Sequence, residues 1–248
     1  SNGFIVFYAG NTTTGFFIPT DRISRWATAP DAVVHGFMYW LWSDSLSKIT
    51  AIDIPNRKIT LENVPVYGIN DTQGGRLFVY NLIEEITEAG EWYLNKASGE
   101  LYLWPPVGFN SSSDIEISML NKPLVSTTNT SYILFKNLDF EGGRERSFLI
   151  NSGQKINIDS CRIINSGTDG ITVLYATQSS IQNSMISGVG SNGITFYAAG
   201  SRVNLTESND LIQNCVISNV GAIKYTGSYG VQIMECVGVK VLHNEMSN

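Results

Sequence analysis

The second half of the chain alternates apolar and polar residues in short runs, each of which follows a glycine. Three such runs are Gly170-Ile171-Thr172-Val173, Gly193-Ile194-Thr195-Phe196 and Gly230-Val231-Gln232-Ile233. A period of two is typical of a strand with one buried face. We therefore predict short strands whose apolar side chains point inward and whose Thr172, Thr195 and Gln232 side chains point outward.

A second set of anchors indicates that these runs belong to a repeat. The anchors are Phe135-Lys136-Asn137-Leu138, Ile158-Asp159-Ser160-Cys161, Ile181-Gln182-Asn183-Ser184, Ile212-Gln213-Asn214-Cys215 and Leu242-His243-Asn244-Glu245. A unit of about 23 residues without a helix fits one coil of a parallel β-helix, whose coils stack ~4.8 Å apart. The frame of leucine-rich repeats is absent, and propeller blades need about 40 residues or more. The predicted fold class is all-β, a right-handed parallel β-helix.

The repeat also predicts which columns of side chains stack along the coils. We expect Asn137, Asn183, Asn214 and Asn244 to form one inward column, because stacked amides can bond to one another along a ladder. Replacing Asn183 should then cost more stability than replacing Asn192, which is expected near the surface.

Cysteine usage agrees with this arrangement. Cys161 and Cys215 fall in one column but two coils apart, roughly 9–10 Å, which exceeds the reach of a disulfide. Together with Cys236 they make an odd number, so a complete disulfide framework is excluded. We predict buried free thiols.

The first half of the chain lacks the repeat. We predict a β-rich lobe over residues 1–107 and coils over residues 108–248. One helix is expected at about Val79–Glu88, and the stretch from Gly90 to Pro106 is expected to form a hairpin with Ala97-Ser98-Gly99 as its turn. Four of the five tryptophans precede residue 93. Most should lie in the core of this lobe, and a minority could stack on sugar rings.

The order of motifs in this lobe resembles a known module. The motifs are His35-Gly36-Phe37-Met38-Tyr39-Trp40, Trp42-Ser43-Asp44, Asn81-Leu82-Ile83-Glu84-Glu85, Gly90-Glu91-Trp92-Tyr93, Gly99-Glu100-Leu101-Tyr102 and Trp104-Pro105-Pro106. They are similar to the insertion domain of β-helix enzymes of glycoside hydrolase family 141, and the similarity covers nearly the whole chain. The resemblance implies a secreted or periplasmic enzyme that hydrolyses cell-wall glycans. It also implies that the acidic pair lies at or beyond Asn248, so this chain would lack part of the catalytic machinery.

Charge and composition narrow the partners. The chain has 248 residues, only 15% of them charged, with a net charge of −6. Nucleic-acid binding needs clustered Lys and Arg, and a membrane span needs about 18 apolar residues in a row; neither pattern occurs. No Cys/His cluster has zinc spacing and no Gly-rich loop precedes a helix, so no metal or cofactor is predicted. The expected partner is a polysaccharide or oligosaccharide, and the oligomeric state stays open.

Two insertions in the repeat indicate where a glycan would bind. One loop spans Ala222–Ser228 and the other runs from about Val203 to Asp210. Insertions at the turns of a solenoid often mark its binding face. The strands between these loops should therefore form a groove. Its predicted contacts are Tyr197, Tyr225, Tyr229, Gln232 and His243.

Hydrolysis of a glycosidic bond uses two carboxyls about 5–9.5 Å apart. Asp169 and Glu235 are the acids nearest the predicted groove, although they flank opposite ends of the strand. We treat both as catalytic candidates. Three classes of function remain open. They are a glycoside hydrolase, a calcium-dependent polysaccharide lyase, and a non-catalytic β-helix for adhesion or glycan binding.

Overall fold

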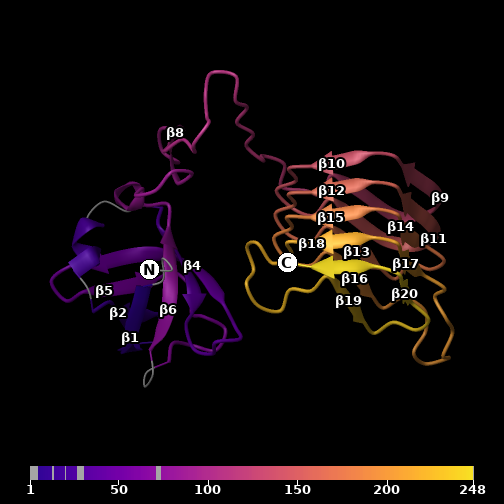
Figure 1. Ribbon diagram of the computed structural model, residues 1–248. Coiled ribbons are helices and arrows are strands. Elements are labelled where there is room, and N and C mark those ends of the chain that lie inside the picture. Colours follow the sequence, from indigo (N-terminus) through magenta and orange to yellow (C-terminus); the bar gives the residue numbers. More distant parts are fainter. Residues whose placement is uncertain (1–4, 13, 20, 27–30, 71–73, 248) are drawn as a thin grey trace. The chain divides into compact units, whose positions relative to one another are not determined.

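The computed structural model describes residues 5–12, 14–19, 21–26, 31–70 and 74–247. Its backbone divides into two compact units, residues 1–114 and 115–248. Figure 1 draws the first unit in indigo to magenta and the second in pink to yellow. Each unit has a hydrophobic core of its own.

The first unit is built around a closed antiparallel barrel. Its strands follow the order β1-β2-β5-β4-β3-β6. Their bounds are β1 (Ile5–Thr12), β2 (Gly15–Phe17), β3 (Val33–Phe37), β4 (Ser45–Asp53), β5 (Lys58–Leu61) and β6 (Gly75–Tyr80). Phe7, Phe16 and Trp26 are fully buried inside it. Closure leaves no strand edge exposed, which stabilises an antiparallel sheet of this size.

The predicted helix at Val79–Glu88 is wrong, whereas the predicted hairpin is confirmed. Strand β6 continues to Tyr80, Asn81 adopts a left-handed φ of 57°, and only a short 3₁₀ turn, η2 (Ile83–Glu85), follows. Asn81 suits this break because its amide oxygen accepts a hydrogen bond from the backbone N–H of Leu94. Strands β7 (Trp92–Asn95) and β8 (Glu100–Leu103) then pair antiparallel.

The second unit is a right-handed parallel β-helix, as predicted. Each coil contributes to three strand rows, and every pairing between coils is parallel. Row A contains β10 (Asp139–Glu141), β12 (Arg162–Ile164), β15 (Met185–Ser187), β18 (Val216–Ser218) and β21 (Glu245–Ser247). Row B contains β13 (Ile171–Leu174), β16 (Ile194–Tyr197) and β19 (Val231–Met234). Row C contains β14 (Ser180–Gln182), β17 (Leu211–Gln213) and β20 (Lys240–Leu242).

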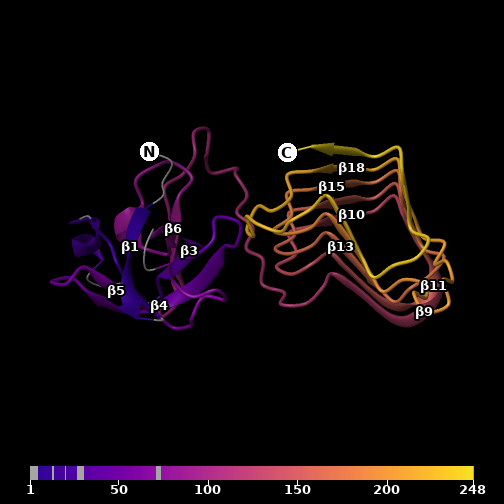
Figure 2. The same ribbon diagram turned by 90° about the horizontal axis from the view of Figure 1, so that it is seen from below.

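Two long strands join rows B and C at one end of the stack. Strands β9 (Val125–Lys136) and β11 (Phe148–Asp159) run through both rows, and β11 pairs with β13 in its first part and with β14 in its last. Figure 2 shows the coils stacked one on another.

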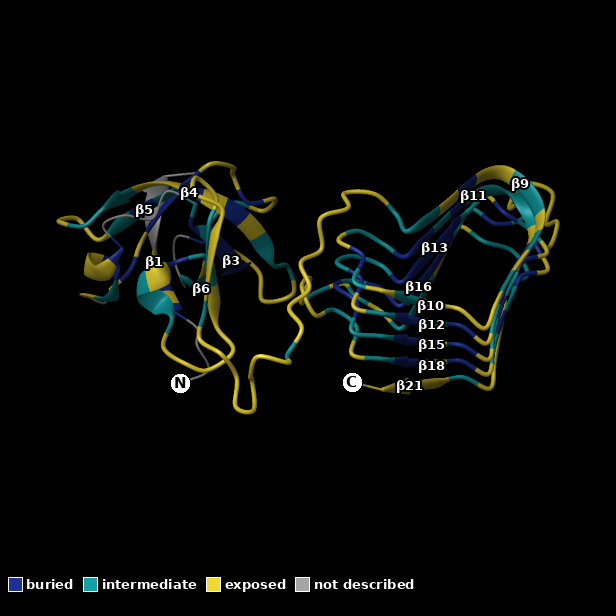
Figure 3. Cartoon of the chain, turned by 90° about the horizontal axis from the view of Figure 1, so that it is seen from above, coloured by how far each residue is buried: buried dark blue, intermediate teal, exposed yellow. Residues whose placement is uncertain are grey.

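The core of the β-helix consists of aligned columns of apolar side chains. Ile171 pairs with Ile194 and Val173 with Phe196, and all four are buried, as the alternation predicted. Ile163, Ile186 and Ile217 form a second buried column in row A. Figure 3 shows these strands as dark blue bands inside the stack. Such regular stacking buries apolar surface continuously from one coil to the next.

The inward asparagine column is wrong. Asn137, Asn183 and Asn214 are exposed and occupy a left-handed corner with φ between 49° and 54°. Asparagine tolerates this conformation better than most residues, so backbone shape and not burial accounts for the recurrence. The amides still form an external ladder: Asn214 Nδ2 donates to Asn183 Oδ1 at 3.3 Å, and Asn183 Nδ2 donates to Asp159 Oδ1 at 2.8 Å.

The last anchor was also placed one residue out of register. Ile212 pairs with Val241 and not with Leu242, so His243 and not Asn244 continues the exposed corner. Asn244 turns inward, where its Oδ1 accepts a hydrogen bond from the backbone N–H of Cys215 at 2.8 Å. Cys161 and Cys215 are buried free thiols, as predicted.

Candidate functional site

The candidate site is the outer face of row B, formed by β13, β16 and β19. A loop over residues 198–210 connects β16 to β17, and a loop over residues 219–230 connects β18 to β19. Both sequence insertions therefore lie at turns that border row B, one at each end of its strands. We call this surface the row B face. It carries Thr172, Thr195, Gln232, Leu174, Tyr197 and Met234.

At the start of the row B face, Asp169 is held by three hydrogen bonds. Its Oδ2 accepts from the hydroxyls of Thr172 at 3.0 Å and Thr195 at 3.1 Å, and its Oδ1 accepts from the backbone N–H of Asn192 at 3.1 Å. The two threonines point outward as predicted, yet they are almost fully buried because this network covers them. Asp169 thus links two adjacent coils.

Asn192 repeats the arrangement one coil further on. Its Oδ1 accepts from the backbone N–H of Tyr229 at 2.9 Å, while its Nδ2 donates to Thr195 at 3.1 Å and to Gln232 Oε1 at 3.0 Å. Only 7% of Asn192 is exposed, so the expectation that it lies near the surface is wrong. Gln232 and the Tyr229 backbone, both predicted site positions, belong to this ladder.

The other end of the row B face is aromatic and more open. Tyr175 and Tyr197 meet edge to face with ring centroids 5.8 Å apart. Glu235 follows β19 in a left-handed conformation, and its carboxylate lies 3.9 Å from the Arg202 guanidinium. The negative charge of Glu235 raises the pKa of the Tyr197 phenol. A glycan could therefore meet ring faces, a carboxylate and a guanidinium at this rim.

Asp169 and Glu235 do not form a hydrolytic pair. Leu174, Tyr197 and Met234 share a column, so Glu235, the next residue after Met234, falls in the column of Tyr175. Along the strand this column lies six residues beyond Asp169, and Glu235 lies two coils away from Asp169. At about 3.3 Å per residue and ~4.8 Å per coil, the separation is roughly 20 Å. This is about twice the largest spacing that glycosidases use.

The remaining predicted contacts divide between two places. Tyr225 is exposed in the loop that precedes β19, beside the row B face. His243 is exposed at the corner that follows β20, where it stacks in register after Asn214. That corner joins row C to row A, so His243 does not lie on the row B face.

Two basic residues near the row B face were not identified from the sequence. Phe148 pairs with Ile171 of the next coil. Arg146 lies two residues before Phe148 and Asp169 two residues before Ile171, so Arg146 occupies the column of Asp169 one coil earlier. Arg202 is supplied by the loop after β16 and pairs with Glu235. The strand register was needed to find Arg146, because the segment around it lacks the glycine spacing of later coils.

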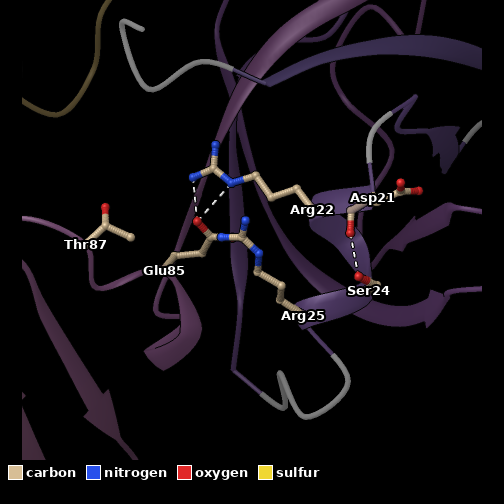
Figure 4. A pocket seen from close by; sticks show the side chains of 6 residues that line it. All are labelled: Asp21, Arg22, Ser24, Arg25, Glu85 and Thr87. Carbon is tan, nitrogen blue, oxygen red and sulfur yellow. Dashed lines mark hydrogen bonds and ion pairs between the residues drawn. The ribbon is translucent and has the colours of Figure 1, made fainter.

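The first unit holds a separate pocket of about 620 Å³, lined by Asp21, Arg22, Ser24, Arg25, Glu85 and Thr87 (Figure 4). Glu85 accepts hydrogen bonds from Arg22 and from the Trp26 indole N–H, tying η1 (Asp21–Arg25) to η2. Burial alone would raise the pKa of Glu85, but these donors together lower it. Most of the charged side chains that line this pocket are therefore engaged in contacts that stabilise the fold.

Within the described ranges, no group of three or more His, Cys, Asp and Glu side chains is placed to share a metal ion. Neither helix in the part of the chain that the structure describes is long and apolar enough to cross a membrane.

A family model described as right handed beta helix region matches residues 109–248. This chain belongs to that family. No curated protein matches the sequence. A solved structure titled "Glycoside hydrolase" is similar over 96% of this chain and 56% of its own length, with 13% identity and a TM-score of 0.70. This likeness extends over both units and shows a shared fold.

The chain thus spans little more than half the length of that glycoside hydrolase. A second structure, the Gp54 tailspike of Acinetobacter baumannii bacteriophage AP22 in complex with a capsular saccharide, aligns with 88% of this chain and 34% of its own. Its identity is 8% and its TM-score 0.24.

Proposed function

We propose that this protein is a secreted glycoside hydrolase that acts on cell-wall polysaccharide, and that its row B face binds the glycan. The observation that carries this proposal is the rim where Tyr175, Met234 and Glu235 are exposed and Tyr197 is half-buried, beside a hydrogen-bonded polar ladder. Ring faces pack against the C–H faces of sugars, and fixed polar groups orient their hydroxyls. The structural likeness to a protein titled glycoside hydrolase adds support at the level of the fold.

Glu235 is the better candidate for a catalytic carboxyl within this chain. It is exposed at the rim, where a glycosidic oxygen could reach it, and Arg202 and Tyr197 lie beside it. Both oxygens of Asp169 already accept hydrogen bonds from adjacent coils. Asp169 is therefore proposed to support the coil structure and only indirectly the chemistry.

A polysaccharide lyase is the second candidate, because Arg146 shares a column with Asp169. Lyases on this architecture use a basic residue near the groove, and the sequence alone had offered little support for one. The two functions differ in products: a lyase leaves an unsaturated sugar that absorbs ultraviolet light, whereas a hydrolase adds water and leaves none.

The test uses the natural protein that contains this chain, incubated with xylan and with fucosylated cell-wall oligosaccharides. New reducing ends without ultraviolet absorbance are expected. Glu235→Gln should lower turnover at least 100-fold while binding stays within about twofold. The matched control is Glu141→Gln, an exposed carboxyl on row A, which should leave turnover unchanged. Equal turnover in Glu235→Gln and the unmodified protein would remove Glu235 from the chemistry, and ultraviolet-absorbing products would favour the lyase.

A further inference from the structure

The barrel unit carries four aromatic rings that are exposed and in contact with one another. Tyr39, Trp40 and Trp42 lie in the turn between β3 and β4, and Tyr67 lies between β5 and β6. Neighbouring centroids are 4.8 Å apart for Tyr39 and Trp40, 6.2 Å for Trp40 and Trp42, and 5.2 Å for Trp42 and Tyr67. We call these four residues the aromatic platform.

The aromatic platform is not part of the barrel core. The barrel has its own buried aromatic residues in Phe7, Phe16 and Trp26. The platform rings instead expose 37% to 60% of their surface, with Trp42 the most exposed. Single exposed apolar residues are ordinary, but contiguous exposed patches mark binding sites. Four adjacent rings form such a patch.

The turns that carry the aromatic platform are held in place. The backbone N–H of Asn70 donates to the Met38 carbonyl at 2.8 Å, and its side-chain amide donates to the Tyr39 carbonyl at 3.4 Å. The backbone N–H of Ser43 donates to the Trp40 carbonyl at 3.2 Å. Fixed rings lose little conformational entropy when a ligand binds, which favours affinity.

The chemistry of the aromatic platform favours an uncharged sugar. The planes of Trp40 and Trp42 are within 12° of parallel, so their faces share one orientation. Electron-rich ring faces attract sugar C–H groups, while the indole N–H and phenol O–H can bond hydroxyls. Residues 38–47 and 59–70 contain no Lys or Arg except Lys-free and Arg-free turns; the Asp44 side chain is buried in a pair with His35, and Glu62 is an exposed carboxylate. The two turns themselves therefore offer a polyanion no positive charge.

We infer that the aromatic platform is a binding site for neutral glycan chains, separate from the row B face. This site goes beyond the proposed hydrolase function, because it binds without reacting and does not depend on any carboxyl. Its role is to hold polysaccharide on the barrel unit. A second copy of this chain and a polyanionic glycan are the other occupants, and both are outcomes of the test below.

The experiment titrates the 248-residue chain with xylohexaose and cellohexaose by calorimetry, with oligogalacturonate as the anionic comparison. A Tyr197→Ala background weakens the row B face, and the further loss that a platform substitution causes in that background reports on the aromatic platform. In that background, Trp42→Ala and Trp40→Ala should each weaken binding of a neutral hexaose at least tenfold. The matched control is Trp92→Ala, because Trp92 on the β7–β8 hairpin is 61% exposed against 60% for Trp42; it should change affinity less than twofold.

Several results would overturn the inference. They are equal weakening by Trp42→Ala and Trp92→Ala, no binding of either neutral hexaose, and tighter binding of oligogalacturonate. If Trp42→Ala changed only the sedimentation of the chain, and not its affinity for sugars, the aromatic platform would be a contact with a second copy. Absence of hydrolysis by the unmodified protein, with platform binding intact, would count against the proposed function alone. Thermal unfolding of each variant confirms that it is folded.

Discussion

Polar side chains at the coil turns bind backbone groups of the neighbouring coil. The hydroxyl of Ser179 accepts from the N–H of Ile156 at 3.2 Å, and that of Ser184 accepts from the N–H of Cys161 at 3.1 Å. In the same way, the Asp169 carboxylate accepts from the N–H of Asn192, and the Asn192 side-chain oxygen accepts from the N–H of Tyr229. Buried backbone donors need such partners, so these residues stabilise the stack more than the exposed asparagines do.

This ranking predicts the outcome of a pair of substitutions. Asn192→Ala should cost about 1–3 kcal/mol, because it leaves the Tyr229 N–H and Gln232 without their partner in a buried network. Asn183→Gly is the matched change: it removes an exposed amide and keeps the left-handed φ of 49° accessible. Urea unfolding gives both values, and a larger loss for Asn183→Gly would contradict the ladder.

Asp210 should make stability depend on pH in an unusual direction. It is fully buried, and Oδ1 accepts from the Ser179 N–H at 2.8 Å. Burial raises the pKa of Asp210 from 3.8 to about 6. The folded state therefore binds the proton more tightly than the unfolded state. This contribution is fully present below about pH 4 and is lost as the pH rises to about 6, by roughly 3 kcal/mol.

Asp210→Ser removes this effect while keeping an acceptor, since Ser179 occupies the equivalent place one coil earlier. We expect the variant to be more stable than the unmodified chain at pH 8 and to lose the decline in stability between pH 4 and pH 6. Unfolding in urea across that range measures both. An unchanged pH profile would show that Asp210 is ionised in the folded state.

At the scale of elements, each coil depends on close backbone contact at its glycines. An added Cβ on Gly193 would lie 2.5 Å from the Gly230 carbonyl oxygen and 2.6 Å from Ile217 Cγ2. Gly170 meets Gly193 in the same way one coil earlier, at 2.7 Å. The recurring glycines are therefore required by the spacing of the coils and not by turn conformation.

Gly193→Ala should accordingly destabilise the chain by about 2–4 kcal/mol, because the backbone of Gly230 must move. The control is Ser191→Ala, which changes a neighbouring side chain without this clash. A glycine with positive φ, such as Gly90 with a φ of 95°, would not serve, because alanine there strains the backbone. The difference in thermal midpoint between Gly193→Ala and Ser191→Ala reports the close approach. Equal midpoints would mean that the coils can separate locally at no cost.

The sequence predicted the strands of the coils well and their faces less well. Alternation located β13, β16 and β19 because their inward residues are uniformly apolar. It failed at Leu242, where Val241, Leu242 and Met246 offer apolar residues on both faces. The anchor was therefore set one residue late: Leu242 was aligned with Ile212 but pairs with Gln213, and Asn244 was given the corner position that His243 occupies.

At the scale of the whole molecule, the repeat made the β-helix predictable and the barrel only partly so. A strand in a solenoid pairs with its own copy one coil later, so self-similarity reveals the partner. In the barrel, β1 pairs with β6 and β3 with β6 across long stretches of sequence, and no local pattern encodes those partners. The row B face was predicted from the sequence, because its strands recur between the two insertions, whereas the hydrogen bonds that join Asp169, Asn192 and Tyr229 were found only in the structure.

The row B face is tested most directly by the crystal structure of this chain with a bound xylohexaose or a fucosylated oligosaccharide. We expect sugar rings across β16 and β19, in contact with Tyr197 and Met234, with a hydroxyl or glycosidic oxygen within hydrogen-bond distance of Glu235. Sugar bound only along row A, or at the corner that carries His243, would contradict it.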